Sequence, residues 1–506
     1  MEPVADVYPA PNGGTRGTGG GLRGEAGIHR TPRGNERLMT VLTALGADDL
    51  IAGFRDRSVS PVEVANEYLR RIDQHNGILN AYLTVTADLA LEAARESEAR
   101  LTAGAELRPL EGIPVALKDN IALAGVRMTA GSPFLANNVP DTDAAVVRRL
   151  KEAGAVVLGK LNMHEWALGA TGVNPHFGPA RNPWDTDRMT GGSSSGAGAA
   201  LGTDLTVLAL GSDTGGSGRI PAALCNVSGL RPTTGRISGA GVVPLAWSFD
   251  IVAPMARRAS DIARLLSVLS GHDPNDPMSV DVATKQYGED DLDVADLRVA
   301  VLSGFFSEDL ESEIGDLVAG VGTTLASLGA HVEPLEIPGI RETLSALTTM
   351  LQAEAAAFHA ERLATDPTRF GASVAERLRS AGERTAPQYG SARQIGRIWK
   401  RRMQEIMRVY DLLLCPTCAV TAPRIGDPND VAVTRALTRL TYPWSLTGLP
   451  SISVPAGLAG GLPVGAQLVG RPWEEATVLR AARAYQDATD RHLRRPDVGD
   501  QVTGSE

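Results

Sequence analysis

The stretch GGSSSGAGAALGTDLTVLALGSDTGGSGR, residues 191–219, carries two glycine-serine clusters on either side of an apolar segment. The run LTVLALGSD from Leu205 predicts a buried strand, because a short continuous apolar run bounded by turn residues is typical of strands buried on both faces. Asp213 to Ser217 would then lie just beyond the C-terminal end of that strand, where open α/β sheets bind their ligands. The stretch therefore predicts an α/β fold with a serine-containing site.

The flanking sequence continues this alternation of strands and helices. Asp141 to Ala153 predicts a helix that ends before Gly154, and AVVLGK from Ala155 predicts a strand. Leu297 to Ile337 predicts a strand, a helix over Glu308 to Leu328, and a second strand. Such alternation is typical of parallel sheets, so we expect an α/β protein with a mixed, mostly parallel sheet.

Other segments predict helices and the limits of the domain. Ser60-Pro61-Val62-Glu63 is a capping box with proline at the first helical position, so a helix begins there. Arg341 to about Met407 has helical periodicity and could form one wall of a substrate pocket. Residues 1–38 are rich in Gly, Pro, Thr and Arg and predict a disordered extension. We expect one domain over 39–495, with two subdomains as the alternative, and a flexible tail over 496–506.

The composition argues against a nucleic-acid or membrane function. The chain has 506 residues and a formal net charge of −10, whereas nucleic acids and anionic membranes are bound by clustered Lys and Arg. The sequence has no basic region followed by an apolar core at its start, and no run of about 18 apolar residues. We expect a cytoplasmic protein with no nucleic-acid and no membrane partner.

The three cysteines predict neither a disulfide framework nor a metal site. Cys415 and Cys418 have C-x-x-C spacing, but no second pair and no histidine cluster could complete a metal site, and Cys225 stands apart. We expect a structural role for the pair, and no metal or other cofactor.

The second cluster and an upstream lysine have the parts of a nucleophilic site. Consecutive glycines over Asp213 to Ser217 allow several backbone N–H groups to point into one concavity, beside the Ser217 hydroxyl. Lys118 ends the apolar run Ile113 to Leu117, and burial in such a strand can lower the pKa of a lysine by several units, so that it can act as a base. A tight turn without a ligand is the alternative for a single cluster of this kind.

Several other interpretations of the clusters fit less well. The first cluster could be a surface loop, and G-x-S-x-G centred on Ser194 resembles a nucleophile elbow, but the preceding NPWDTDRMT predicts a loop instead of the required strand. DTGG occurs once, whereas aspartic proteases need two such carboxylates. Neither cluster completes a phosphate-binding glycine motif. The downstream histidines lack a pattern typical of a catalytic triad: His272, His331, His359 and His492.

Three motifs in this order resemble the signature elements of the amidase signature family of serine hydrolases: VALKDN around Lys118, GGSSSGAG, and GSDTGGSGRIPAA. GKLNMHEWALG from Gly159, GLRPTTGRIS from Gly229 and YPWSLTGLPSISVPAG near the end are also similar. The resemblance covers residues 45–488. It implies the amidase signature fold, in which a mixed, mostly parallel sheet is covered by helices on both faces.

The resemblance also implies roles for particular residues. Ser217 would be the nucleophile, Ser193 a bridging serine that follows a cis peptide bond, and Lys118 the base. Asp213 and Arg219 would brace the loop. The oxyanion hole would consist of backbone N–H groups of Thr214, Gly215, Gly216 and Ser217.

Three positions depart from the family's usual text. Ser195 stands at a usual glycine, Ala197 at a usual serine, and Gly218 at a usual isoleucine. None is a catalytic position, so the departures bear on substrate scope.

The predicted activity is hydrolysis of the C–N bond of an amide through an acyl intermediate on Ser217. Aryl and aliphatic amides, carbamates (urethanase activity) and esters are the expected small-molecule substrates. The alternative is the glutaminase subunit of a tRNA-dependent amidotransferase. A non-catalytic scaffold fits poorly, since stability does not require Lys118, Ser193 and Ser217 together. A homodimer is left open.

Overall fold

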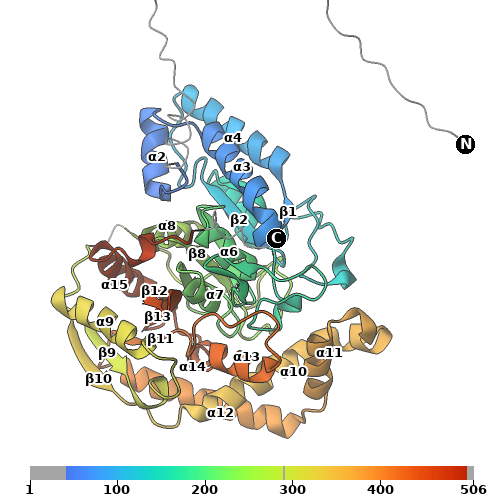
Figure 1. Ribbon diagram of the computed structural model, residues 1–506, viewed down its shortest axis with the longest axis vertical. Helices are drawn as coiled ribbons and strands as arrows, with labels where there is room; N and C mark the ends of the chain where they lie inside the picture. The colour runs from blue at the N-terminus through green and yellow to red at the C-terminus, as the bar shows by residue number, and fades with distance from the viewer. Residues whose placement is uncertain (1–41, 289–290, 498–506) are drawn as a thin grey trace, which may run out of the picture. The chain divides into compact units, whose positions relative to one another are not determined.

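The computed structural model describes residues 42–288 and 291–497, and it is built around an eleven-stranded mixed sheet (Figure 1). The sheet order is β1 (Tyr82–Val85), β3 (Val156–Leu161), β2 (Pro114–Lys118), β6 (Leu208–Ser212), β8 (Val252–Ala256), β7 (Ser228–Arg231), β12 (Ser451–Ala459), β13 (Leu462–Gly470), β11 (Leu412–Pro416), β9 (Arg298–Leu302) and β10 (His331–Leu335). The α/β class and the mixed sheet are therefore confirmed.

Parallel pairing is found in two groups of strands. β3, β2 and β6 are parallel to one another, and so are β11, β9 and β10. The neighbours between the groups, and the edge pair β1–β3, are antiparallel. Because β2 and β6 run side by side in the same direction, their C-terminal ends bring Lys118 and the second glycine-serine cluster to one edge of the sheet.

Helices cover both faces of the sheet. On one face, alternate β12 and β13 residues such as Ile452 and Leu468 pack with α8 (Ala259–Leu269), α9 (Ile314–Ser327) and α15 (Glu475–Asp487) in one apolar core. On the other face α7 (Arg219–Leu224) packs so closely that a Cβ at Gly465 would lie 2.5 Å from the Ala223 side chain. Close approach of helix and strand thus depends on glycine at this position.

The remaining helices lie in chain order around these layers. They are α2 (Ala47–Asp56), α3 (Pro61–Leu79), α4 (Ala87–Thr102), α5 (Ala145–Glu152), α6 (Ser195–Gly202), α10 (Arg341–Thr365), α11 (Ala372–Gly382), α12 (Ala386–Ile406), α13 (Asp430–Thr438) and α14 (Tyr442–Thr447). α3 begins at Pro61 with the predicted capping box, in which the Ser60 hydroxyl accepts a hydrogen bond from the Glu63 N–H. In the part of the chain that the structure describes, no helix is long and apolar enough to cross a membrane.

One predicted helix begins later than the sequence pattern indicates. α9 starts at Ile314, not at Glu308. The reason is tertiary: the Glu311 carboxylate accepts hydrogen bonds from the Thr421 N–H and hydroxyl, and the Glu311 N–H donates to the Ala419 carbonyl. These contacts hold the segment as a loop against the chain after β11.

The domain limits stay a prediction. Backbone contacts group residues 41–506 as one unit. The extension over 1–38 and most of the tail over 496–506 lie outside the described residues.

Candidate active site

Lys118, the last residue of β2, holds two serine hydroxyls. Its fully buried Nζ lies 2.7 Å from Ser193 Oγ and 2.7 Å from Ser212 Oγ. Ser212 ends the parallel neighbour β6, and Ser193 lies in the loop before α6, after a cis Gly192–Ser193 peptide bond. The structure therefore brings together the predicted base and the predicted bridging serine.

Burial makes Lys118 a weak acid. Desolvation lowers the pKa of Lys118 from 10.5 to about 7, against the opposing charges of Asp250 and Asp213. Its hydrogen-bond partners are neutral hydroxyls. Lys160, on the neighbouring strand β3, is also buried but pairs with the Asp119 carboxylate at 3.1 Å. Of these two lysines, Lys118 is the one whose surroundings favour a neutral amine near neutral pH.

Ser217 lies on the loop between β6 and α7. The Ser217 carbonyl accepts a hydrogen bond of 3.2 Å from the Ser194 N–H, which joins the two clusters. Among the described residues, no hydrogen bond links the Ser193 and Ser217 hydroxyls. The Ser217 side chain instead faces a cavity of about 560 Å³, which it lines together with Gly215, Gly169 and Ala170.

The four predicted oxyanion donors are not equivalent. The Gly216 N–H donates to Asp213 Oδ1 at 2.8 Å, so it is occupied within the loop. The N–H groups of Thr214, Gly215 and Ser217 have no hydrogen-bond partner among the described residues. These three donors are therefore available to a ligand, and the role of Gly216 stays a prediction.

A buried ionic network holds the nucleophile loop. Asp213 accepts hydrogen bonds from Arg219 Nε at 2.9 Å and Arg219 Nη2 at 3.0 Å, and it pairs with Arg231 Nη1 at 3.2 Å. Burial alone would raise the pKa of Asp213, but the charges of Arg219 and Arg231 outweigh it and lower that pKa below its usual range. Arg219 also donates to Gln467 Oε1 at 3.1 Å and Ser445 Oγ at 2.9 Å. These contacts fit the bracing role that the resemblance implies for Asp213 and Arg219.

Replacing Asp213 by asparagine should strongly destabilise the fold. Asp213→Asn would leave two buried guanidinium groups without a counter-charge, a change that costs about 3–5 kcal/mol of unfolding free energy. Urea denaturation measures this loss. The control is Asp187→Asn, whose exposed carboxylate lies 3.8 Å from Arg424 and should contribute little. Equal denaturation midpoints for the two variants would contradict a stabilising role of the network.

The histidine nearest to the site is not placed as a base for the serines. The His164 N–H donates to the Ser193 carbonyl at 3.1 Å, but the imidazole contacts the Thr171 hydroxyl, at 3.4 Å. Burial lowers the pKa of His164 to about 3. The predicted histidines His359 and His492 are buried in other parts of the chain, which agrees with their exclusion.

Two residues of this site were not singled out by the sequence. Ser212 bonds Lys118, yet both faces of β6 are buried, so no polar-apolar alternation shows which way a residue of this strand points. Gln467 on β13 receives a hydrogen bond from Arg219 and donates to the carbonyls of Pro416 and Leu440. Its position in an apolar strand was the one available signal.

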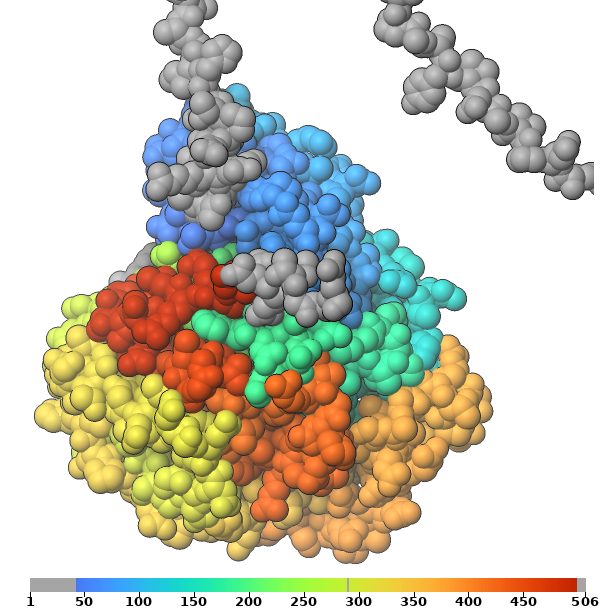
Figure 2. All heavy atoms as spheres, viewed as in Figure 1, coloured from blue at the N-terminus to red at the C-terminus, as the bar shows by residue number. Residues whose placement is uncertain are grey.

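The predicted helical wall of the pocket is present. α10 and α11, within the segment Arg341 to Met407, line one side of the cavity, and α13 lines another. Figure 2 shows α13 in darker orange and the helical block in lighter orange side by side at the surface, and Arg377 of α11 bonds Asp430 of α13 at 2.7 Å. The cavity thus lies between segments that are distant in sequence.

Comparison with known proteins agrees with this geometry. A family model described as Amidase matches residues 63–479. The chain belongs to the amidase signature family. It is 40% identical over 484 residues to a glutamyl-tRNA(Gln) amidotransferase subunit from Moorella thermoacetica, covering 90% of this chain and 99% of the relative.

Solved structures of the family superpose closely. A protein from a vestigial complex linked to the origins of an s-triazine catabolic enzyme has a TM-score of 0.83 and 33% identity, with 88% of this chain and 98% of that chain covered. A bacterial aryl acylamidase of the amidase signature family has a TM-score of 0.82 and 26% identity, with coverage of 90% and 99%. The predicted family and the enzyme class, a hydrolase acting on C–N bonds of amides, are confirmed.

One prediction is wrong. The sequence was expected to act on small molecules without a nucleic-acid partner, but the curated relative is named as one subunit of an amidotransferase for a tRNA. Net charge misled here because −10 is a sum over the whole chain, and it does not describe the charge of any one surface.

Proposed function

We propose that this chain hydrolyses an amide through an acyl intermediate on Ser217, with Lys118 as the base and Ser193 as the proton relay. The observation that carries the proposal is the buried hydrogen bond of 2.7 Å between Lys118 Nζ and Ser193 Oγ. A lysine of lowered pKa next to a hydroxyl, close to a second serine that faces a cavity, is the arrangement a lysine-based serine hydrolase needs.

The proposed steps balance protons and bonds. Ser217 Oγ bonds to the amide carbon as its proton passes to Ser193 Oγ and the Ser193 proton passes to neutral Lys118 Nζ. The free N–H groups of Thr214, Gly215 and Ser217 stabilise the oxyanion. The C–N bond then breaks while the relay returns a proton to the leaving nitrogen. Water cleaves the acyl ester and regenerates Ser217, with the carboxylic acid as product.

The rate of acylation should rise with pH through the pKa of Lys118. The base must be neutral, and its pKa is about 7, so kcat/KM should increase about tenfold per pH unit below that value and level off above it. Stopped-flow acylation between pH 5 and pH 9 measures the profile. A rate that falls as pH rises through 7 would contradict a lysine base.

A covalent probe tests the nucleophile. A fluorophosphonate should label the wild-type chain on Ser217, and peptide mapping by mass spectrometry identifies the labelled residue. Failure to label, under conditions in which a control amidase reacts, would overturn the proposed function. Carbamates and esters present the same carbonyl to Ser217 and are proposed as further substrates.

A second candidate is the ammonia-supplying glutaminase subunit of a tRNA-dependent amidotransferase. The curated relatives favour this setting over a free-standing amidase, since they are named as amidotransferase subunits at 36–40% identity over most of this chain. Co-purification of the tagged chain from its own host tests it. A stable complex that raises glutamine hydrolysis would support the amidotransferase, and a fully active chain without partners would contradict it.

A further inference from the structure

The cavity next to Ser217 is strongly cationic. The described residues that line it include no aspartate or glutamate, but they include five arginines: Arg341, Arg377, Arg384, Arg435 and Arg439. These arginines come from α10, α11, the segment before α12, and α13 with the residue after it. A reaction that only needs to bind a neutral amide gives no reason for such a lining.

Two of the five cations are already neutralised. Arg377 pairs with the Asp430 carboxylate at 2.7 Å, and Arg341 pairs with the Glu308 carboxylate. Asp430 and Glu308 do not belong to the residues that line the cavity. The two pairs therefore hold their helices and leave three arginines to consider.

The other three arginines have no carboxylate partner among the described residues. Arg384 donates to the Gln352 side-chain oxygen at 2.7 Å and the Thr349 hydroxyl at 3.4 Å, and its buried Nε has no partner. Arg439, which is buried, donates to the carbonyls of Phe305 and Glu308. For Arg435, which is exposed at the cavity, no side-chain hydrogen bond or ion pair is found in the described ranges.

The arginines lie close enough to affect one another. Burial is the largest cause that lowers the pKa of Arg439, and the charges of Arg341 and Arg435 lower it further, whereas Asp309 and Glu308 act in the opposite direction. An anion in the cavity would relieve this repulsion, and a cation would add to it.

We propose that the amide substrate of this site carries a carboxylate on its non-reacting part, bound by Arg384, Arg435 and Arg439, and carries no ammonium group. The inference rests on the proposed amide hydrolysis and adds its substrate class. Guanidinium groups bind carboxylates through paired, charge-assisted hydrogen bonds, which explains arginines at this position better than lysines. A substrate ammonium would find no acidic side chain in the lining.

The first test measures protection of Ser217 from a neutral fluorophosphonate. Glutarate and adipate should slow the labelling, because they place carboxylates on the arginines and fill the cavity. Diamines of the same length should not. Arg384→Gln and Arg435→Gln should each weaken the protection about tenfold, the loss expected for a hydrogen bond to a charged group.

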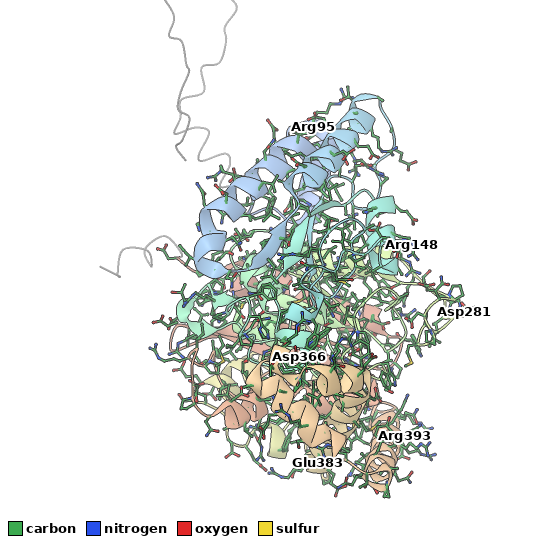
Figure 3. The ribbon with its side chains drawn as sticks, turned by 90° about the vertical axis from the view of Figure 1, so that its right-hand side faces the viewer. Arg95, Arg148, Asp281, Asp366, Glu383 and Arg393 are labelled. Carbon is green, nitrogen blue, oxygen red and sulfur yellow. The ribbon has the colours of Figure 1, made fainter. Side chains whose placement is uncertain are left out.

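The matched control is Arg393→Gln. Arg393 lies on α12 and is exposed, as Figure 3 shows, and it does not line the cavity. This variant removes the same charge from the same helical block, so protection should equal that of the wild type. Equal loss of protection in all three variants would overturn the proposal, because it would reflect net charge and not a site.

The second test compares rates of hydrolysis. Succinamate, glutaramate and adipamate are paired with butanamide, pentanamide and hexanamide, in which a methyl group replaces the carboxylate. The best carboxylated amide should exceed its neutral partner at least tenfold in kcat/KM. Glutamine, which adds an ammonium group to glutaramate, should be at least tenfold slower than glutaramate.

The outcomes separate this inference from the proposed function. Faster hydrolysis of the neutral amides, or of glutamine over glutaramate, would overturn the inference while amide hydrolysis stands, and the glutamine result would favour the amidotransferase. Loss of Ser217 labelling in the wild type would overturn the proposed function itself.

Discussion

Ser217→Ala should reduce kcat/KM for amide hydrolysis by at least about 10⁴-fold. The hydroxyl is the atom that becomes acylated in the proposed reaction, and the nearby Ser193 hydroxyl is held by Lys118. No residue is left to form the covalent intermediate. The residual rate would come from the oxyanion donors and substrate binding alone. Single-turnover assays with the best substrate, together with fluorophosphonate labelling, measure the loss.

The control for this prediction is Ser195→Ala. Ser195 is a buried serine of the first cluster, and its hydroxyl donates a hydrogen bond of 3.3 Å to the Asn162 carbonyl. It contacts neither Lys118 nor the cavity lining, so the variant should stay within a few-fold of wild-type activity. Thermal unfolding of both variants separates lost chemistry from lost fold. Near-normal turnover by Ser217→Ala would contradict the acyl-enzyme mechanism.

The sequence could predict the strands that carry the site, because apolar runs have local signatures. Ile113 to Leu117 and the run from Leu205 were expected as buried strands, and β2 and β6 lie at these places. Parallel neighbours then bring their C-terminal ends together. This places Lys118 beside the second cluster without knowledge of any long-range contact.

The finer geometry depends on long-range contacts that leave no local pattern. The Gly216 N–H turns toward Asp213 at a backbone φ of 131°, which glycine adopts freely, so the sequence does not indicate which donors stay available. Arg384 and Arg439 reach one cavity from segments more than 50 residues apart. Each lies in an ordinary polar or helical context, and their common surroundings appear only in the folded chain.

Lys118→Met should lower the rate of acylation by about 10²–10⁴-fold, the usual contribution of a general base, and should abolish the rise of the rate with pH through 7. Methionine keeps most of the side-chain volume and brings no charge into a fully buried place, so the variant should fold. The pH profile is the decisive readout, because a merely structural loss would lower the rate at every pH and leave its shape unchanged. Lys160→Met is the contrast: it strips the buried Asp119 carboxylate of its partner, so it should lower the denaturation midpoint while the folded fraction keeps the wild-type profile. A Lys118→Met enzyme that still gains activity through pH 7 would show that another group is the base.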